Sequence, residues 1–274
     1  MIFVPLLTSH RILEHPLAIH GALMFLAFNL ASSAAYIVND LLDREADRQH
    51  PEKRRRPFAS GAPVWAGLTA APVLLLAAAA ICLALPSGAL VVLAGYTGLS
   101  LCYSLFLKQR ALLDVFALSV LYTLRIVAGH ESTGVVYSAW LLSFSMFIFL
   151  SLALVKRVSE LRNLRVRGVS AAPGRGYQTA DLEQLNTFGV GSGFIAALVL
   201  ALYINSSAVV PLYSRPLLLW LLCPMMLYWI CRIWILTWRG EMHEDPIAFA
   251  AHDGQTYLIA AAGLAVLVLA ARSF

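Results

Sequence analysis

The chain has 274 residues, of which 60% are hydrophobic and only 13% are charged, and its mean hydropathy is +0.75. A water-soluble domain usually carries about 25% charged residues, so this composition excludes a soluble protein and indicates a polytopic helical membrane protein. The net charge of +5 does not indicate a nucleic-acid partner, because the basic residues flank the apolar runs, where membrane topology accounts for them.

Eight apolar runs follow one another, and each is long enough for a membrane-spanning helix of about 20 residues. They cover approximately residues 17–38, 64–86, 88–106, 111–128, 138–155, 187–207, 217–238 and 256–272. Strands are not expected, because the runs are long and do not alternate between apolar and polar side chains. Residues 1–9, MIFVPLLTS, are too short to cross a bilayer and are expected to be the end of a ninth span.

The basic residues are distributed unevenly over the two sides of these spans. Fifteen of the twenty Lys and Arg residues lie on the side reached after residues 38, 106, 155 and 238. By the positive-inside rule, this side faces the cytoplasm, and we expect an inner-membrane protein. The acids share this side, with only Glu14 and Glu131 opposite, although the rule does not require it. Their clustering indicates an active site for a charged substrate at the cytoplasmic face.

The first acidic cluster ends the run at 17–38. Asn39, Asp40, Asp43 and Asp47 follow a helical spacing, so one helix face is expected to collect the three carboxylates. Like charges at a membrane boundary repel one another, and a divalent cation removes that repulsion. Mg²⁺ prefers oxygen ligands and is usually shared between carboxylates and substrate phosphates, so we interpret Asp40, Asp43 and Asp47 as magnesium ligands and Asn39 as a substrate contact. A solvated helix end, paired with neighbouring arginines, is the alternative.

A basic segment, HPEKRRRPFASG, follows directly at residues 50–61. Its bases either anchor the helix end at the membrane surface or bind phosphate oxygens, to which arginine offers two donors at once. Prolines on both sides fix the segment as a non-helical loop. The candidate phosphate ligands are Lys53, Arg54 and Arg56.

These segments resemble a known family. NDLLDREAD (39–47) matches the NDxxDxxxD motif of the UbiA-type intramembrane prenyltransferase superfamily. HPEKRRRPFASG, YSLFLKQRALLD, LRIVAGH, LVKRVSEL and EDPIAFAAHD are similar to its decaprenyl-phosphate phosphoribosyltransferase branch. The resemblance implies one domain, 1–274, with nine transmembrane helices, the first truncated, around a central cavity. It places the active site at the cytoplasmic face, beneath loops at about 40–63 and 157–186, and implies a role in cell-wall biosynthesis.

The second motif departs from the superfamily pattern. Aromatic prenyltransferases carry a second Asp-rich motif that binds another Mg²⁺, whereas this chain has Lys156, Arg157 and Glu160 at that place. The resemblance implies that Lys156 and Arg157 bind phosphate, and that Glu160 contacts metal or ribose. Alternatively, Lys156 and Glu160 simply pair on one helix face.

Four further residues are ambiguous. Tyr103 and Lys108 end one span, where they either contact the substrate or anchor the helix at the interface. Asp114 is expected to pair with Lys108 or Arg110. Arg125 lies in mid-span, where an isolated charge is costly, so it either pairs with a buried acid, which we favour, or lines the cavity.

The resemblance implies a Mg²⁺-dependent transfer of phosphoribose from phosphoribosyl pyrophosphate to a polyprenyl phosphate such as decaprenyl phosphate. The lipid phosphate is already anionic, so the reaction requires no strong general base. The alternative is a prenyltransferase that moves a polyprenyl chain from its diphosphate to an aromatic acceptor such as 4-hydroxybenzoate. A transporter is disfavoured, because its ionisable residues would lie near the bilayer midplane. Formation of a homo-oligomer is left open.

Overall fold

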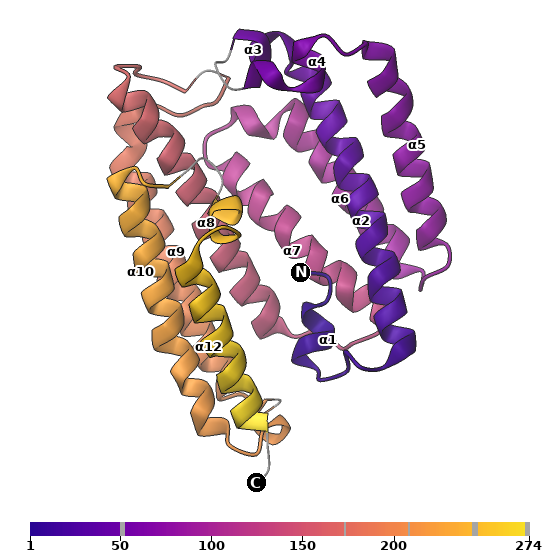
Figure 1. Ribbon diagram of the computed structural model, residues 1–274, viewed down its shortest axis with the longest axis vertical. Coiled ribbons are helices and arrows are strands. Elements are labelled where there is room, and N and C mark those ends of the chain that lie inside the picture. The colour runs from indigo at the N-terminus through magenta and orange to yellow at the C-terminus, as the bar shows by residue number, and fades with distance from the viewer. Residues whose placement is uncertain (50–52, 173, 208, 243–245, 272–274) are drawn as a thin grey trace. The chain divides into compact units, whose positions relative to one another are not determined.

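The computed structural model describes residues 1–49, 53–172, 174–207, 209–242 and 246–271, and the elements of this part are helical (Figure 1). Eight of its helices are long and apolar enough to cross a membrane, which confirms an all-α polytopic membrane protein. They are α2 (His15–Leu42), α5 (Val64–Cys82), α6 (Gly88–Leu105), α7 (Leu113–Thr133), α8 (Ala139–Val166), α9 (Leu182–Ile204), α10 (Leu222–Arg239) and α12 (Gly254–Ala271).

Short helices join these spans. At the place of the expected ninth span lies α1 (Val4–Thr8), which has only 5 residues, so the count of nine is approximate. The connecting elements are α3 (Arg44–Gln49), η1 (Lys53–Arg55), α4 (Pro57–Ser60), η2 (Leu107–Gln109), η3 (Thr179–Asp181), η4 (Val210–Leu212), η5 (Pro216–Leu221) and α11 (Pro246–Ala250).

The chain divides into two compact units. The first contains residues 1–108 and 120–137, and the second contains residues 109–119 and 138–274. Helix α7 therefore contributes its first turns to the second unit and its remainder to the first.

In the first unit, α2 packs against α5 and α6 along a face of small residues. Ala27, Ala31 and Ala34 are fully buried on this face, which allows the helix backbones to approach closely. Phe28 of α2 and Tyr96 of α6 lie with their ring centroids 4.8 Å apart. These contacts hold the end of α2 that carries the acidic motif on a rigid scaffold.

The second unit is built from α8, α9, α10 and α12, and a chain of hydrogen bonds ties three of these helices together. Ser151 of α8 donates to the Gly189 carbonyl of α9 at 2.8 Å and accepts from Trp234 Nε1 of α10 at 3.1 Å. A Cβ atom on Gly189 would collide with the Trp234 ring, so the close approach of these helices requires glycine here.

Helix α8 is longer than the apolar run predicted. It continues to Val166, so the loop expected at 157–186 begins only after the C-cap residue, Arg167. The reason is amphipathic packing, because Val158 and Leu161 are buried on the inner face of this extension. Lys156, Arg157 and Glu160 therefore stand on a rigid helix rather than in a loop.

Substitution at Gly189 tests this packing. We expect Gly189→Ala to lower the free energy of unfolding by about 1–3 kcal/mol, because the added methyl group overpacks the contact with Trp234. The control is Gly191→Ala in the same helix, where the structure leaves open space around the new Cβ and alanine raises helix propensity. Thermal unfolding of both variants in detergent compares them, and equal melting temperatures would refute the packing argument.

Candidate active site

The acidic motif lies where α2 passes into α3. Asp43 is the C-cap of α2, with its N–H bonded to the Asn39 carbonyl at 2.9 Å, and the Asp47 N–H continues this pattern to the Asp43 carbonyl at 2.8 Å. The helical spacing therefore persists across the break between the two helices. As a result, Asp40 and Asp47 point to a common position even though they belong to different helices.

A single guanidinium occupies that position. Nη1 of Arg56 lies 3.0 Å from Asp40 Oδ1 and 2.9 Å from Asp47 Oδ2. Arg56 precedes Pro57 and has the extended backbone (φ −62, ψ 146) that a following proline favours, and Gly61 ends α4 with a φ of 122. This local geometry folds the basic segment back over the end of α2.

The third carboxylate has its own cation. Nζ of Lys108, from η2 after α6, lies 2.5 Å from Asp43 Oδ1 and 3.2 Å from Asn39 Oδ1. The Lys108 side chain is only 12% exposed, which strengthens the pair relative to one in water. The structure thus brings Asn39, Asp43 and Lys108 together.

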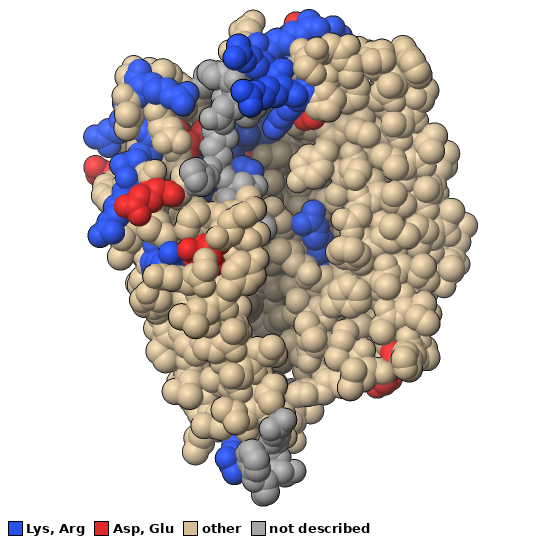
Figure 2. Space-filling view, viewed as in Figure 1, with Lys and Arg blue, Asp and Glu red and all other residues tan. Residues whose placement is uncertain are grey.

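The other residues of the first unit that were predicted to bind the substrate are Lys53, Arg54 and Tyr103. Arg54 is exposed, and Tyr103 packs against the hydrophobic core of the unit. The Lys53 side chain lies outside the described part of the structure. Figure 2 shows Lys and Arg side chains gathered over the end of the first unit that carries α3 and α4.

The acidic motif suits a divalent cation. No group of three metal-binding side chains is preassembled in the part of the chain that the structure describes. However, one Arg56 nitrogen bridges Asp40 and Asp47, which shows that two carboxylates from different helices converge on one positive charge. All candidate ligands are hard oxygen donors, the kind that Mg²⁺ prefers, so these residues fit that metal.

A second cluster forms in the second unit around Asp114, in the first turn of α7. Asp114 is fully buried and binds Arg157 Nη2 at 2.6 Å and the Tyr177 hydroxyl at 2.5 Å. The expected pairing with Lys108 or Arg110 is therefore wrong, because Asp114 pairs with Arg157 and Lys108 pairs with Asp43. The hydroxyl of Tyr177 also accepts from the Leu112 N–H at 2.7 Å, and burial followed by the Asp114 carboxylate raises the pKa of Tyr177 above its usual value.

Arg157 and Glu160 meet within this cluster. The Arg157 guanidinium is only 1% exposed, and it donates to both Asp114 and Glu160. Arg175, which follows α8 in the chain, approaches Glu160 at 3.7 Å and is 21% exposed. Lys156 precedes Arg157 on α8 and is half-buried. A charged residue at the start of an apolar run was the sequence signal for Asp114, but its partners lie far away in the chain.

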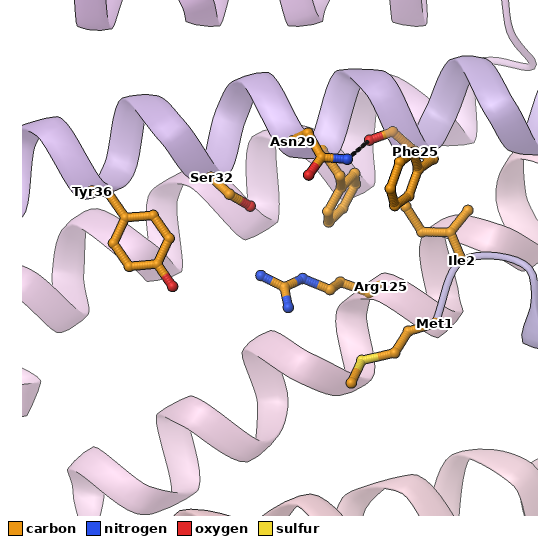
Figure 3. A pocket seen from close by; sticks show the side chains of 8 residues that line it. Met1, Ile2, Phe25, Asn29, Ser32, Tyr36 and Arg125 are labelled. Atoms are coloured by element: carbon orange, nitrogen blue, oxygen red, sulfur yellow. Dashed lines mark hydrogen bonds between the residues drawn. The ribbon is translucent and has the colours of Figure 1, made fainter. Parts of the chain in front are cut away.

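Arg125 lines a pocket in the first unit (Figure 3). The pocket has a volume of about 330 Å³. Its other walls are formed by side chains of α2 and by Met1 and Ile2, which precede α1. Arg125 donates to the Tyr96 hydroxyl at 3.3 Å and lies over the Tyr122 ring at 5.1 Å. The favoured pairing with a buried acid is not found among the described side chains, whereas the alternative position beside a cavity is.

Comparison with known proteins gives two extensive sequence matches. The protein y4nM of Sinorhizobium fredii, described as uncharacterized, is 37% identical over 272 residues, which cover 98% of this chain and 53% of that protein. The nodulation protein NoeC of Azorhizobium caulinodans is 36% identical over 97% of this chain and 86% of its own length.

A third relative matches over a shorter region. The decaprenyl-phosphate phosphoribosyltransferase of Mycobacterium tuberculosis is 38% identical over 141 residues, which are 51% of this chain and 47% of that enzyme. The chain thus spans about half the length of y4nM, whereas its match to the mycobacterial enzyme covers about half of each of the two sequences.

Solved structures show the same fold. A UbiA homolog from Archaeoglobus fulgidus bound to GPP and Mg²⁺ matches with a TM-score of 0.67 at 17% identity, over 91% of this chain and 88% of that chain. The model of the UbiA prenyltransferase family matches residues 4–258. With the extended match to NoeC, this shows that the chain is a membrane protein of the UbiA prenyltransferase family.

Proposed function

We propose that this chain transfers 5-phosphoribose from phosphoribosyl pyrophosphate to a polyprenyl phosphate at the cytoplasmic face of the inner membrane and releases pyrophosphate. The observation that carries the proposal is the α2 cluster, in which three aspartates and two bases meet at the end of an apolar helix. The 38% identity to decaprenyl-phosphate phosphoribosyltransferases over half of the chain supports this donor and acceptor. The excess of basic residues on one side supports the orientation.

The residues of the α2 cluster act on the pyrophosphate of the donor. Asp40, Asp43 and Asp47 would hold Mg²⁺, which supplies positive charge to the pyrophosphate when it is bound. Arg56 and Lys108 exchange their carboxylate partners for pyrophosphate oxygens and stabilise the charge that develops there. Asn39 orients the Lys108 amine, which it already contacts at 3.2 Å.

The transfer itself needs no base from the protein. The bond between ribose C1 and the pyrophosphate oxygen breaks, and its electron pair leaves with the pyrophosphate. An oxygen of the lipid phosphate forms the new bond to C1, which carries positive charge in the transition state. Lys156 and Glu160 on α8 are assigned to the ribosyl phosphate part of the donor, where the amine binds phosphate and the carboxylate contacts ribose.

A prenyltransferase is the second candidate. It is favoured by one observation, namely that solved structures of the same fold are complexes with GPP or DMAPP and Mg²⁺. In that reaction the α2 cluster would bind the diphosphate of a polyprenyl donor, and the acceptor would be an aromatic compound such as 4-hydroxybenzoate.

A direct assay separates these candidates. We expect the purified protein, incubated with Mg²⁺, decaprenyl phosphate and labelled phosphoribosyl pyrophosphate, to produce labelled lipid and pyrophosphate. A parallel reaction contains polyprenyl diphosphate and 4-hydroxybenzoate. Product in the second reaction together with no labelled lipid in the first would overturn the proposal in favour of the prenyltransferase.

Neutralising one acid of the cluster tests its role in turnover. We expect Asp40→Asn and Asp43→Asn each to reduce kcat/KM about 100-fold or more, because the site loses a carboxylate that would hold Mg²⁺, whose positive charge would stabilise the departing pyrophosphate. The control is Glu45→Gln, which changes an exposed acid in α3 that pairs with the neighbouring Arg44 and Arg48. The measurement is the transfer rate of variants whose melting temperatures equal that of the unmodified protein, so that a loss of activity does not reflect unfolding. If both aspartate variants retained the activity of Glu45→Gln, the metal assignment would be wrong.

Lys108 provides a test that does not depend on turnover. Lys108→Met removes a cation that competes for Asp43, so we expect Mn²⁺ to bind about fivefold more tightly in the absence of pyrophosphate. With pyrophosphate present, we expect weaker Mn²⁺ binding than in the unmodified protein, because Lys108 no longer contacts that anion. Electron paramagnetic resonance of free Mn²⁺ measures both constants.

The matched control for this test is Arg110→Gln, an exposed base two residues away in the same loop. It should leave both Mn²⁺ constants within about twofold of the original. A change in the same direction with and without pyrophosphate would contradict the exchange of partners by Lys108.

A further inference from the structure

The cluster around Asp114, called the α8 cluster below, consists of Asp114, Arg157, Glu160, Arg175 and Tyr177. Its two arginines differ in their access to water. The Arg157 side chain is 1% exposed and donates to two carboxylates, whereas that of Arg175 is 21% exposed. A phosphate that arrives from water can therefore contact Arg175 but not Arg157 in this arrangement. Phosphate binding by arginine requires an accessible guanidinium face.

Arg157 instead serves the acids of the cluster. Asp114 is 0% exposed, and a buried carboxylate without a counter-charge is costly by several kcal/mol. Arg157 also neutralises Glu160, whose charge would otherwise repel an incoming phosphate. The effect of Arg157 is thus to fix and neutralise the carboxylates beneath the place where a phosphate would bind.

The segment 174–178, which carries Arg175, is held in place through Tyr177. The Tyr177 side chain is buried, and its hydroxyl joins the Asp114 carboxylate at 2.5 Å to the Leu112 N–H at 2.7 Å. Leu112 has a φ of 66, a left-handed conformation that is strained for a leucine and persists only where the surroundings impose it. Its amide bonds to Tyr177 in this conformation.

Gly176 allows this segment to lie directly on the backbone. A Cβ atom at this position would lie 2.8 Å from both the Ala111 nitrogen and the Gln109 carbonyl oxygen. Two adjacent residues, Gly176 and Tyr177, therefore fix the segment by close backbone approach and by hydrogen bonding. Arg175 precedes them directly and approaches Asp114 at 3.9 Å.

From this geometry we infer that Arg175 is a phosphate-binding residue for the donor and that Asp114, Arg157 and Tyr177 are its positioning residues. The inference rests on the proposed function for the identity of the donor, and it transfers the phosphate contact expected of Arg157 to Arg175. The phosphate is either the 5-phosphate of the ribose or the pyrophosphate, and binding of each separately distinguishes them.

The binding test uses ribose 5-phosphate and inorganic pyrophosphate with Mg²⁺ as probes of the purified full chain. We expect Arg175→Gln to raise the dissociation constant of one probe about tenfold, because a charge-assisted contact is lost. Arg167→Gln is the matched control, an exposed arginine eight positions earlier in the chain, and should change neither constant more than about twofold. Equal constants for both variants with both probes would overturn the assignment of Arg175.

The positioning role has a separate readout, trypsin cleavage after Arg175 in the ligand-free protein. Tyr177→Phe removes only the hydroxyl, and we expect it to accelerate this cleavage about fivefold while leaving cleavage after the exposed Arg239 unchanged. It should also raise the KM for phosphoribosyl pyrophosphate with little change in kcat. This variant is preferred to Asp114→Asn, which leaves Arg157 buried with one carboxylate fewer. An unchanged rate after Arg175 would refute the positioning role.

These outcomes are distinguishable from failure of the proposed function. If the unmodified protein makes no labelled lipid, the phosphoribosyl transfer itself is refuted. Pyrophosphate binding and trypsin cleavage still decide the roles of Arg175 and Tyr177, because both candidate donors carry a pyrophosphate and cleavage needs no substrate.

Discussion

The neutralisation of buried charge organises both units of this protein. An ionised side chain that leaves water beside apolar helices costs several kcal/mol unless an opposite charge compensates it. Asp114 is fully buried with Arg157, and Asp47, nearly buried in α3, binds Arg56. In each case the partner lies outside the helix that carries the acid, so the counter-charge ties a second segment to that helix. The α4 turn, the η2 turn and the 174–178 segment all carry such a partner.

The two clusters differ in their charge balance. In the α2 cluster, three aspartates face Arg56 and Lys108, and the remaining negative charge suits a divalent cation. In the α8 cluster, Asp114 and Glu160 are matched by two arginines, Arg157 and Arg175. Its acids are already neutralised, so this cluster suits an anion rather than a metal. Residues of the same types thus serve two chemistries, because the ratio of acids to bases differs.

Sequence patterns predicted those features that depend on neighbouring residues. Membrane helices follow from continuous apolar runs, and the spacing of Asp40, Asp43 and Asp47 follows from helical periodicity, which persists through the break at Asp43. The predicted end of α8 was wrong, because hydropathy marks where a helix leaves the membrane and not where its amphipathic packing ends. The predicted partner of Asp114 was also wrong, since its actual partner, Arg157, lies 43 residues away and only the folded path of the chain brings the two together.

The charge of the α8 cluster also bears on which donor the chain uses. A polyprenyl diphosphate is anionic at one end and hydrocarbon throughout the rest, so it requires one basic cluster and an apolar channel. Phosphoribosyl pyrophosphate is anionic at both ends, because the ribose carries a further phosphate at its 5-position. A second basic cluster has a ligand in the second case and none in the first. Glu160 is already bound by Arg157 and Arg175, which leaves it a poor substitute for the Asp-rich metal motif that a prenyl diphosphate would use. The presence of bases where other members of the superfamily carry acids therefore favours the donor that has two separate phosphate groups.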